Sequence, residues 1–175
     1  YGIGLFENHG SIVAHAAAGQ PKTTVWLLET MSSNGTIDAD RVRFHGNSNS
    51  EIATITGSFK ADVTEVNNVN VRMSGTVLGL GDVIIGTWGP GPFDLTGATF
   101  APGTTTLPSL RLGGTLITSE DLTVTGTLSL AGTLRGVGGQ GSLVGLSGGT
   151  ISGLSLQEGF DLSNPQNQTI TWSGG

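Results

Sequence analysis

A short tripeptide recurs throughout this 175-residue chain and constrains its fold more than any other feature. Glycine, then serine or threonine, then a large apolar residue occurs ten times, where the composition predicts roughly two by chance. Glycine adopts turn conformations that other residues resist, and a hydroxyl–apolar pair is typical of a strand's first residues. The copies begin at Gly10, Gly35, Gly57, Gly75, Gly86, Gly114, Gly126, Gly132, Gly141 and Gly149. We therefore expect an all-β fold of many short strands with glycine at the corners.

Alternating apolar and polar residues support this expectation. Val69, Val71 and Met73 alternate with Asn70 and Arg72, as expected for a strand with one buried and one solvent-exposed face. The chain has 30 glycines and only 11% charged residues, but 36% of its residues are hydrophobic and recur in such runs. This pattern predicts a folded chain rather than a disordered linker.

The composition of the sequence changes along the chain. Residues 1–88 carry most of the basic residues and the longer strands, and predict a β-sandwich-like region with an antiparallel or mixed sheet. Residues 89–109 predict a Pro/Gly-rich irregular connection. Residues 110–175 consist of short Thr/apolar strands separated by glycine, which predicts a β-solenoid-like region and leaves a sandwich open.

The second half carries a resemblance to a known class of proteins. Gly113-Gly114-Thr115-Leu116 through Ile151-Ser152-Gly153-Leu154-Ser155-Leu156 resembles the passenger regions of autotransporters and filamentous-haemagglutinin-type surface proteins. It also resembles the β-helical fibre proteins of phage. The resemblance implies an elongated, non-enzymatic surface structure for adhesion or assembly, with no catalytic residues to transfer.

Charge and composition exclude several function classes. The formal net charge of −6 and the absence of a Lys/Arg cluster argue against nucleic-acid binding. The chain has no cysteine, so it has no disulfide, thiolate metal site or cysteine nucleophile. No stretch is long and apolar enough for a membrane-spanning helix. We predict no cofactor.

Polar residues do not form a recognised catalytic or metal-binding motif. Asp38 and Asp40 share one face of a strand, and Arg41 and Arg43 follow directly, so we interpret them as a solvated face with local charge compensation. The three histidines are too scattered to predict a metal site. They are His9, His15 and His45.

The tryptophans bear on a competing function. Trp26, Trp88 and Trp172 each lie in an apolar or β-branched run, which favours core or interface packing over sugar stacking. A carbohydrate-binding or carbohydrate-cleaving β-helix would need acids and exposed aromatics together. The sequence places them apart, so this function remains an alternative.

The N-terminus suggests a mode of assembly. Large apolar residues alternate with glycine from Tyr1 through Ile3 and Leu5 to Phe6, as in a strand donated to a neighbouring subunit. An ordinary first strand is the other interpretation. Asn34 and Asn167 begin the two N-x-Ser/Thr sequons, which become glycosylation sites if the protein is secreted in a glycosylating organism.

These observations lead to one functional hypothesis. We expect a non-enzymatic structural subunit of a self-assembling extracellular filament, sheath or adhesive fibre at the cell surface. Its partners would be copies of itself, and glycans or a cell surface are further candidate partners. A virion fibre or capsid-decorating protein is an alternative with the same physical requirements.

Overall fold

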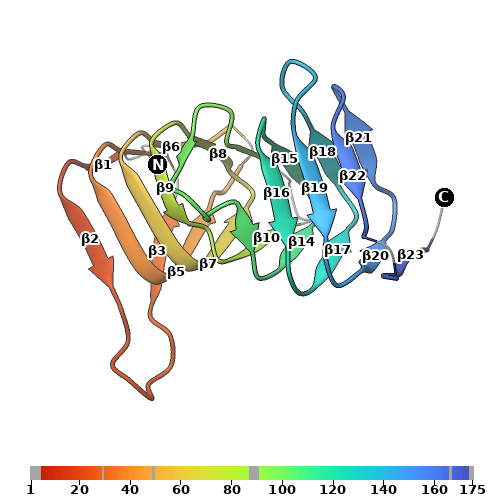
Figure 1. Ribbon diagram of the computed structural model, residues 1–175. Helices are drawn as coiled ribbons and strands as arrows, with labels where there is room; N and C mark the ends of the chain where they lie inside the picture. The colour runs from red at the N-terminus through yellow and green to blue at the C-terminus, as the bar shows by residue number, and fades with distance from the viewer. Residues whose placement is uncertain (1–4, 29, 49, 87–90, 166, 174–175) are drawn as a thin grey trace.

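The computed structural model describes residues 5–28, 30–48, 50–86, 91–165 and 167–173. These ranges contain 23 strands and no helix, which confirms the all-β prediction. Every pairing between named strands is parallel, and the strands stack into successive coils (Figure 1). The described chain is therefore a β-solenoid.

Three sheets form the faces of the solenoid. Sheet A has eight strands, one from each coil. They are β1 (Phe6–Asn8), β4 (Met31–Ser33), β6 (Ile52–Ile55), β8 (Asn70–Met73), β11 (Pro92–Asp94), β15 (Thr115–Ile117), β18 (Thr133–Arg135) and β21 (Ser155–Gln157). Sheet C has four strands, which are β13 (Thr106–Leu107), β16 (Asp121–Val124), β19 (Ser142–Gly145) and β22 (Asp161–Ser163).

Sheet B has eleven strands and bends around a corner of the solenoid. They are β2 (Ser11–Ala14), β3 (Thr24–Leu28), β5 (Thr36–His45), β7 (Ser58–Asn67), β9 (Thr76–Gly79), β10 (Asp82–Ile85), β12 (Thr99–Phe100), β14 (Leu110–Leu112), β17 (Leu128–Leu130), β20 (Gly149–Ile151) and β23 (Ile170–Trp172). The first part of β5 pairs with β2 and its second part with β3. Sheet B therefore supplies two faces in the early coils, and sheet C supplies one of the three from the fifth coil onward.

The coils differ in length, and this explains the unequal spacing of the glycine tripeptides. Phe6 pairs with Met31, Met31 with Ala53, and Ala53 with Val71, so successive equivalent positions are not equally spaced. The extra residues lie in loops at the corners, such as the segment between β2 and β3 that projects from the body (Figure 1). Surface loops of different length cost little free energy, so the stacked strands stay in register.

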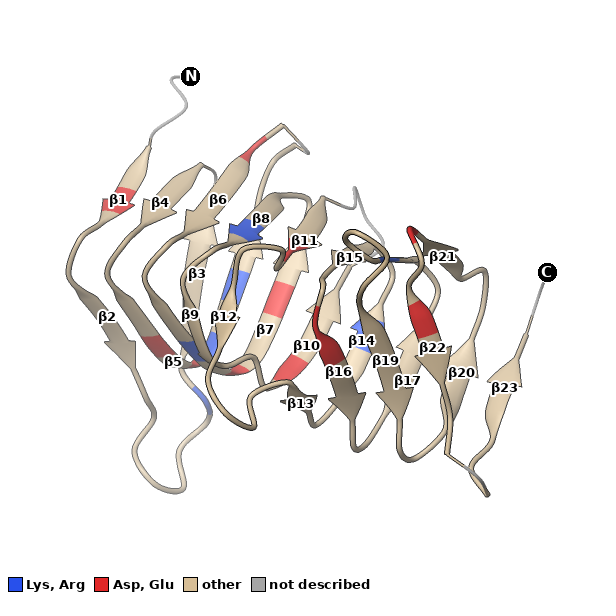
Figure 2. Cartoon of the chain, turned by 45° about the horizontal axis from the view of Figure 1, so that its top comes forward, with Lys and Arg blue, Asp and Glu red and all other residues tan. Residues whose placement is uncertain are grey.

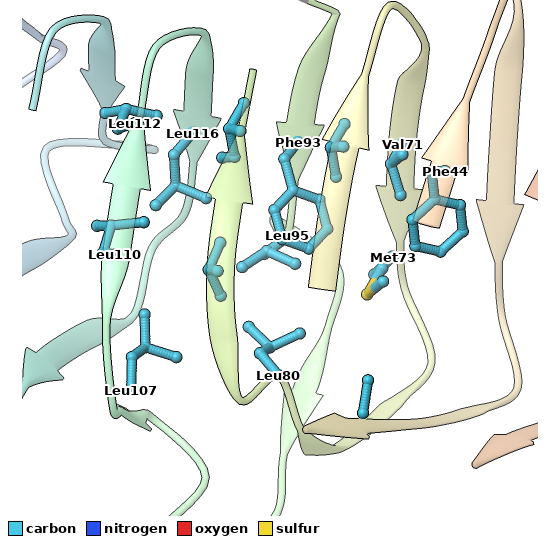
Figure 3. Close-up of a cluster of buried hydrophobic side chains, with 14 of the residues drawn as sticks. Phe44, Val71, Met73, Leu80, Phe93, Leu95, Leu107, Leu110, Leu112 and Leu116 are labelled. Carbon is cyan, nitrogen blue, oxygen red and sulfur yellow. The ribbon is translucent and has the colours of Figure 1, made fainter. Parts of the chain in front are cut away.

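Inward-facing side chains stack directly above one another to form the core. One such row runs along sheet A and is buried from its second to its seventh coil. It consists of Met31, Ala53, Val71, Phe93, Leu116 and Leu134. Figure 3 shows Phe93, Val71 and Leu116 of this row beside apolar side chains from sheet B. Burial of each Val, Leu or Phe contributes about 1.5–3 kcal/mol relative to exposure.

The glycine tripeptides occupy corners, as the sequence predicts. Gly35, Gly57 and Gly75 lie in one column, and each is followed by a strand of sheet B. A Cβ on Gly57 would lie 1.9 Å from the carbonyl oxygen of Gly35, and a Cβ on Gly75 would lie 1.9 Å from that of Gly57. Only glycine allows this close approach of consecutive backbones.

The prediction of a sandwich-like N-terminal half is wrong. Strands β1 to β10 pair in parallel in the same coil arrangement as the later strands. Alternation of apolar and polar residues indicates one buried face, but it does not distinguish an antiparallel sheet from a solenoid. The 89–109 segment contains β11, β12 and β13, which belong to the fifth coil.

Candidate functional site

A row of outward-facing side chains runs along sheet B from the first coil to the last. Trp26 pairs with Arg43, and Arg43 pairs with Glu65 on the next coil. Because side chains alternate along a strand, these residues point away from the buried Leu27 and Phe44. We call the full set the outer row: Trp26, Arg43, Glu65, Ile84, Arg111, Ser129, Thr150 and Thr171.

Aromatic and charged groups meet at the N-terminal end of the outer row, on the strands where Figure 2 shows several of the charged residues. The Arg43 guanidinium lies 4.3 Å from the centroid of the Trp26 ring, and the His45 ring contacts the same indole edge-on at 6.4 Å. Arg43 also pairs with Glu65, whose other oxygen lies 3.6 Å from Arg41 Nη1. Trp26 nevertheless remains 52% exposed.

A shallow depression of 430 Å³ lies farther along the same face. Residues from five successive coils line it, and Arg111 lies on the middle one of these coils, in the outer row. Among the described residues no carboxylate lies within ion-pair distance of Arg111. The lining consists of Asn67, Ile84, Ile85, Gly86, Arg111, Leu112, Gly113, Ser129, Ala131 and Ser152.

A second polar cluster closes the projecting loop between β2 and β3. The Asp40 carboxylate accepts hydrogen bonds from the backbone N–H of Ala16 at 2.7 Å and of Thr23 at 3.0 Å. The His15 ring bridges two carboxylates, with Nδ1 2.9 Å from Asp40 Oδ1 and Nε2 3.0 Å from Asp38 Oδ1. Both ends of the loop are therefore held by one side chain, at the bend of β5.

These contacts shift two protonation equilibria. The N–H groups of Ala16 and Thr23, together with His15, lower the pKa of Asp40 to about 2. The hydrogen bond to Asp40 and the nearby charge of Asp38 raise the pKa of His15. Each shift favours the charged form, so protonated His15 and ionised Asp40 are the pair that this geometry stabilises.

The first and last coils lie at opposite ends of the stack (Figure 1), and both leave inward-facing apolar side chains exposed. Phe6 occupies the sheet A core row at one end and is 48% exposed, whereas its neighbour Met31 is 2% exposed. Leu156 occupies the same row at the other end and is 46% exposed. At the first coil, an apolar depression of 240 Å³ is lined by Phe6, Trp26, Leu27, Leu28 and Met31.

The sequence-predicted assembly and glycosylation residues lie in different parts of the molecule. Tyr1 and Ile3 lie outside the described residues, so the donor-strand hypothesis stays a prediction. Leu5 is exposed, and Phe6 begins β1, which pairs with β4. Asn34 is exposed at a corner, where its side-chain oxygen lies 2.9 Å from His9 Nδ1. Asn167 is also exposed and has a φ of 74°.

Two interpretations of polar and aromatic residues are wrong. Arg41 and Arg43 do not compensate Asp38 and Asp40, since they pair with Glu65 on the next coil. Asp40 is 9% exposed and hydrogen-bonded rather than solvated. Packing in the core of a single chain is also wrong for Trp26 and Trp172, which are 52% and 61% exposed. Interface packing of these residues stays a prediction, and Trp88 lies outside the described residues. No local signal identifies Glu65 as the partner of both arginines, because parallel stacking joins residues about a coil apart.

Comparison of the chain with protein-family models, with curated proteins and with solved structures found no match. In the part of the chain that the structure describes, no group of three or more His, Asp or Glu side chains is placed to hold a metal ion. No helix among the described residues has the length and apolar character needed to cross a bilayer.

Proposed function

We propose that this β-solenoid is a non-enzymatic structural subunit of an extracellular or cell-surface assembly, in which copies of the chain stack end to end. The exposure of core-row side chains at both ends is the observation that carries the proposal. Phe6 and Leu156 continue the buried row of sheet A, and no further strand among the described residues covers them as the inner members of that row are covered.

Each end of the stack presents three strands. The first coil presents β1, β2 and β3 as its three strands, and the last coil presents β21, β22 and β23. If β21 of one copy lies beside β1 of the next, Leu156 covers Phe6 and the core row continues. In the same arrangement Trp172 lies in the row that begins with Leu27. Stacking thus continues the three faces of the solenoid and buries apolar surface, the main driving force for association.

Light scattering and negative-stain electron microscopy over a series of protein concentrations will test this proposal. We expect the parent chain to form elongated particles that lengthen with concentration. Phe6→Asp and Leu156→Asp each place a carboxylate in the new interface, where burial of an unpaired charge is costly, and should leave monomers. Circular dichroism will show that both variants keep their strands.

Leu146→Asp is the matched control, because Leu146 is also exposed but lies in the turn after β19, on the seventh coil and not on either end coil. It should assemble like the parent. A parent chain that stays monomeric from micromolar to millimolar concentration would overturn the proposal. Assembly that Leu146→Asp blocks and Phe6→Asp leaves intact would indicate lateral contacts instead.

A further inference from the structure

The outer row combines three features of a ligand-binding face. It has an exposed indole at Trp26, a depression with polar side chains in its lining, and Arg111 on the middle one of the coils that line this depression. Trp26 lies on the first coil, next to the proposed end-to-end interface, whereas the depression lies farther along the stack. All three lie on one side of sheet B. Trp26 and Arg111 are four coils apart, or roughly 19 Å at the usual spacing of about 4.8 Å between neighbouring strands.

The charge of this face differs from that of the whole chain. Three arginines lie on it, namely Arg41, Arg43 and Arg111, against the carboxylates of Glu65 and Asp82. Glu65 is shared by two arginines, and Asp82 accepts a hydrogen bond from Ser109 at 2.7 Å. The face therefore carries a small excess of positive charge in a chain whose formal net charge is −6. An anionic ligand is favoured here.

The shape of the face restricts the ligand further. Backbone N–H and C=O groups in its inner strands are used in the parallel ladder, so a peptide cannot add as another strand on this face. The positive charges are too few and too far apart for a phosphate backbone. A ligand must instead use one aromatic surface, separated cationic groups, and hydroxyl and amide partners such as Ser129 and Asn67.

We propose that the outer row of sheet B binds an acidic polysaccharide chain that lies along the solenoid axis. The apolar face of one sugar ring stacks on the exposed part of the Trp26 indole, which Arg43 and His45 hold in place. A carboxylate of a later sugar pairs with Arg111, and the sugar hydroxyls bond to Ser129, Asn67 and Ser152. The small residues Gly86, Gly113 and Ala131 leave room for the chain.

Isothermal titration calorimetry with an oligogalacturonate tests the proposal, with a neutral cello-oligosaccharide of equal length and polyglutamate as comparison ligands. We expect binding of the oligogalacturonate that weakens as salt is added, since ionic contacts are screened. The neutral oligosaccharide should bind more weakly because it cannot pair with Arg111. Polyglutamate should also bind more weakly because it has no sugar ring for Trp26.

Two variants and two matched controls locate the site. Trp26→Ala should weaken oligogalacturonate binding about tenfold, and Arg111→Gln about fivefold. Trp172→Ala removes another exposed tryptophan outside the outer row, and Arg72→Gln removes an exposed arginine of sheet A. Both controls should bind like the parent, and thermal unfolding of all four will show that the fold is kept.

Other outcomes overturn the inference. Equal binding of polyglutamate would show simple charge attraction, and equal binding of the neutral oligosaccharide would remove the role of Arg111. Failure of the parent chain to bind oligogalacturonate would contradict the proposed site. Control variants that lose as much affinity for oligogalacturonate as Trp26→Ala would contradict it as well. Trp26 and Trp172 both lie on end coils, so the titrations are repeated in a Leu156→Asp background, in which the proposed end-to-end contact is blocked. Binding of the oligogalacturonate that is kept in this background, and lost on Trp26→Ala or Arg111→Gln, separates ligand binding from assembly.

Discussion

The first four coils and the last four coils use the same stacking but different chemistry. The early coils contain the ten-residue strands β5 and β7, which bend around a corner and carry paired charges on their outer side. The corresponding later strands, such as β14, β17 and β20, have three residues each. The late coils are stabilised mainly by rows of buried leucine side chains and by glycine corners at which consecutive backbones approach closely. The early coils add longer runs of strand pairing and specific polar contacts. A solenoid can therefore vary its outer chemistry from coil to coil while the core pattern stays constant.

The largest effect is expected at the corner column of the early coils. Gly57→Ala would place a Cβ 1.9 Å from the Gly35 carbonyl oxygen, so the two coils must separate. We expect a loss of at least about 3 kcal/mol in the free energy of unfolding, measured by urea denaturation. Gly10→Ala is the control, because no atom lies within 4 Å of the added Cβ. Equal stability of the two variants would contradict the stacked corner.

Core truncation should affect both halves. Phe44 and Leu130 are both fully buried in the same inward row of sheet B, one in each half of the chain. Phe44→Ala should cost about 3–5 kcal/mol and Leu130→Ala about 2–5 kcal/mol, from lost burial and the cavity left behind. If the coils unfold together, each variant shifts one common transition in calorimetry. A second transition that only Leu130→Ala shifts would show that the two halves unfold independently.

Removing the carboxylate of an ion pair should reduce the free energy of unfolding more in the early coils than in the late coils. The Glu65 side chain is 8% exposed and contacts Arg41 and Arg43, whereas Glu158 is 56% exposed and lies 3.7 Å from Arg135. Glu65→Gln should cost about 1–2 kcal/mol, because it leaves two partly buried arginines without their carboxylate. Glu158→Gln should change stability by less than about 0.5 kcal/mol. Chemical denaturation of both variants checks this difference, and equal losses would contradict it.

The smallest expected effect is a local pH dependence of the projecting loop. The pKa of Asp40 is lowered, so its contribution is present above 3.8 and is lost as the pH falls toward about 2. The pKa of His15 is raised, so its contribution is complete below 6.5 and is lost as the pH rises through the folded-state value. The loop should therefore be most protected between these limits.

Hydrogen exchange at the Ala16 and Thr23 amides measures that protection, after correction for the intrinsic pH dependence of exchange. Asp40→Asn should raise the exchange rate at both amides and remove most of the pH dependence. The amides of β17 and β20 are the internal reference, because all three histidines lie in the first two coils. A pH response of equal size in β17 and β20 would assign the effect to global stability rather than to the loop.

Local patterns predicted several of the strands and many of the glycine corners. The glycine tripeptides precede β2, β5, β7, β9, β15, β18 and β19, and the Asn70–Met73 alternation corresponds to β8. The parallel pairing of the first half was missed because one buried face looks the same in a sandwich and in a coil. The contacts at the N-terminal end of the outer row were not predicted from the sequence, for a related reason. Trp26, Arg43 and Glu65 are far apart in the sequence, and only the register of β3, β5 and β7 joins them.

The sequence by itself determined the all-β class, the position of glycine at tight corners and the alternation that separates core from surface. These are properties of neighbouring residues, because backbone conformation and side-chain direction depend on local geometry. Only the tertiary structure decided which coils pair, which carboxylate neutralises Arg41 and Arg43, and which apolar side chains remain exposed at the ends. Coil length is set by loops such as 15–23, whose cost depends only weakly on length. The partner of each residue is therefore fixed by the stacking of whole coils and not by its neighbours in the chain.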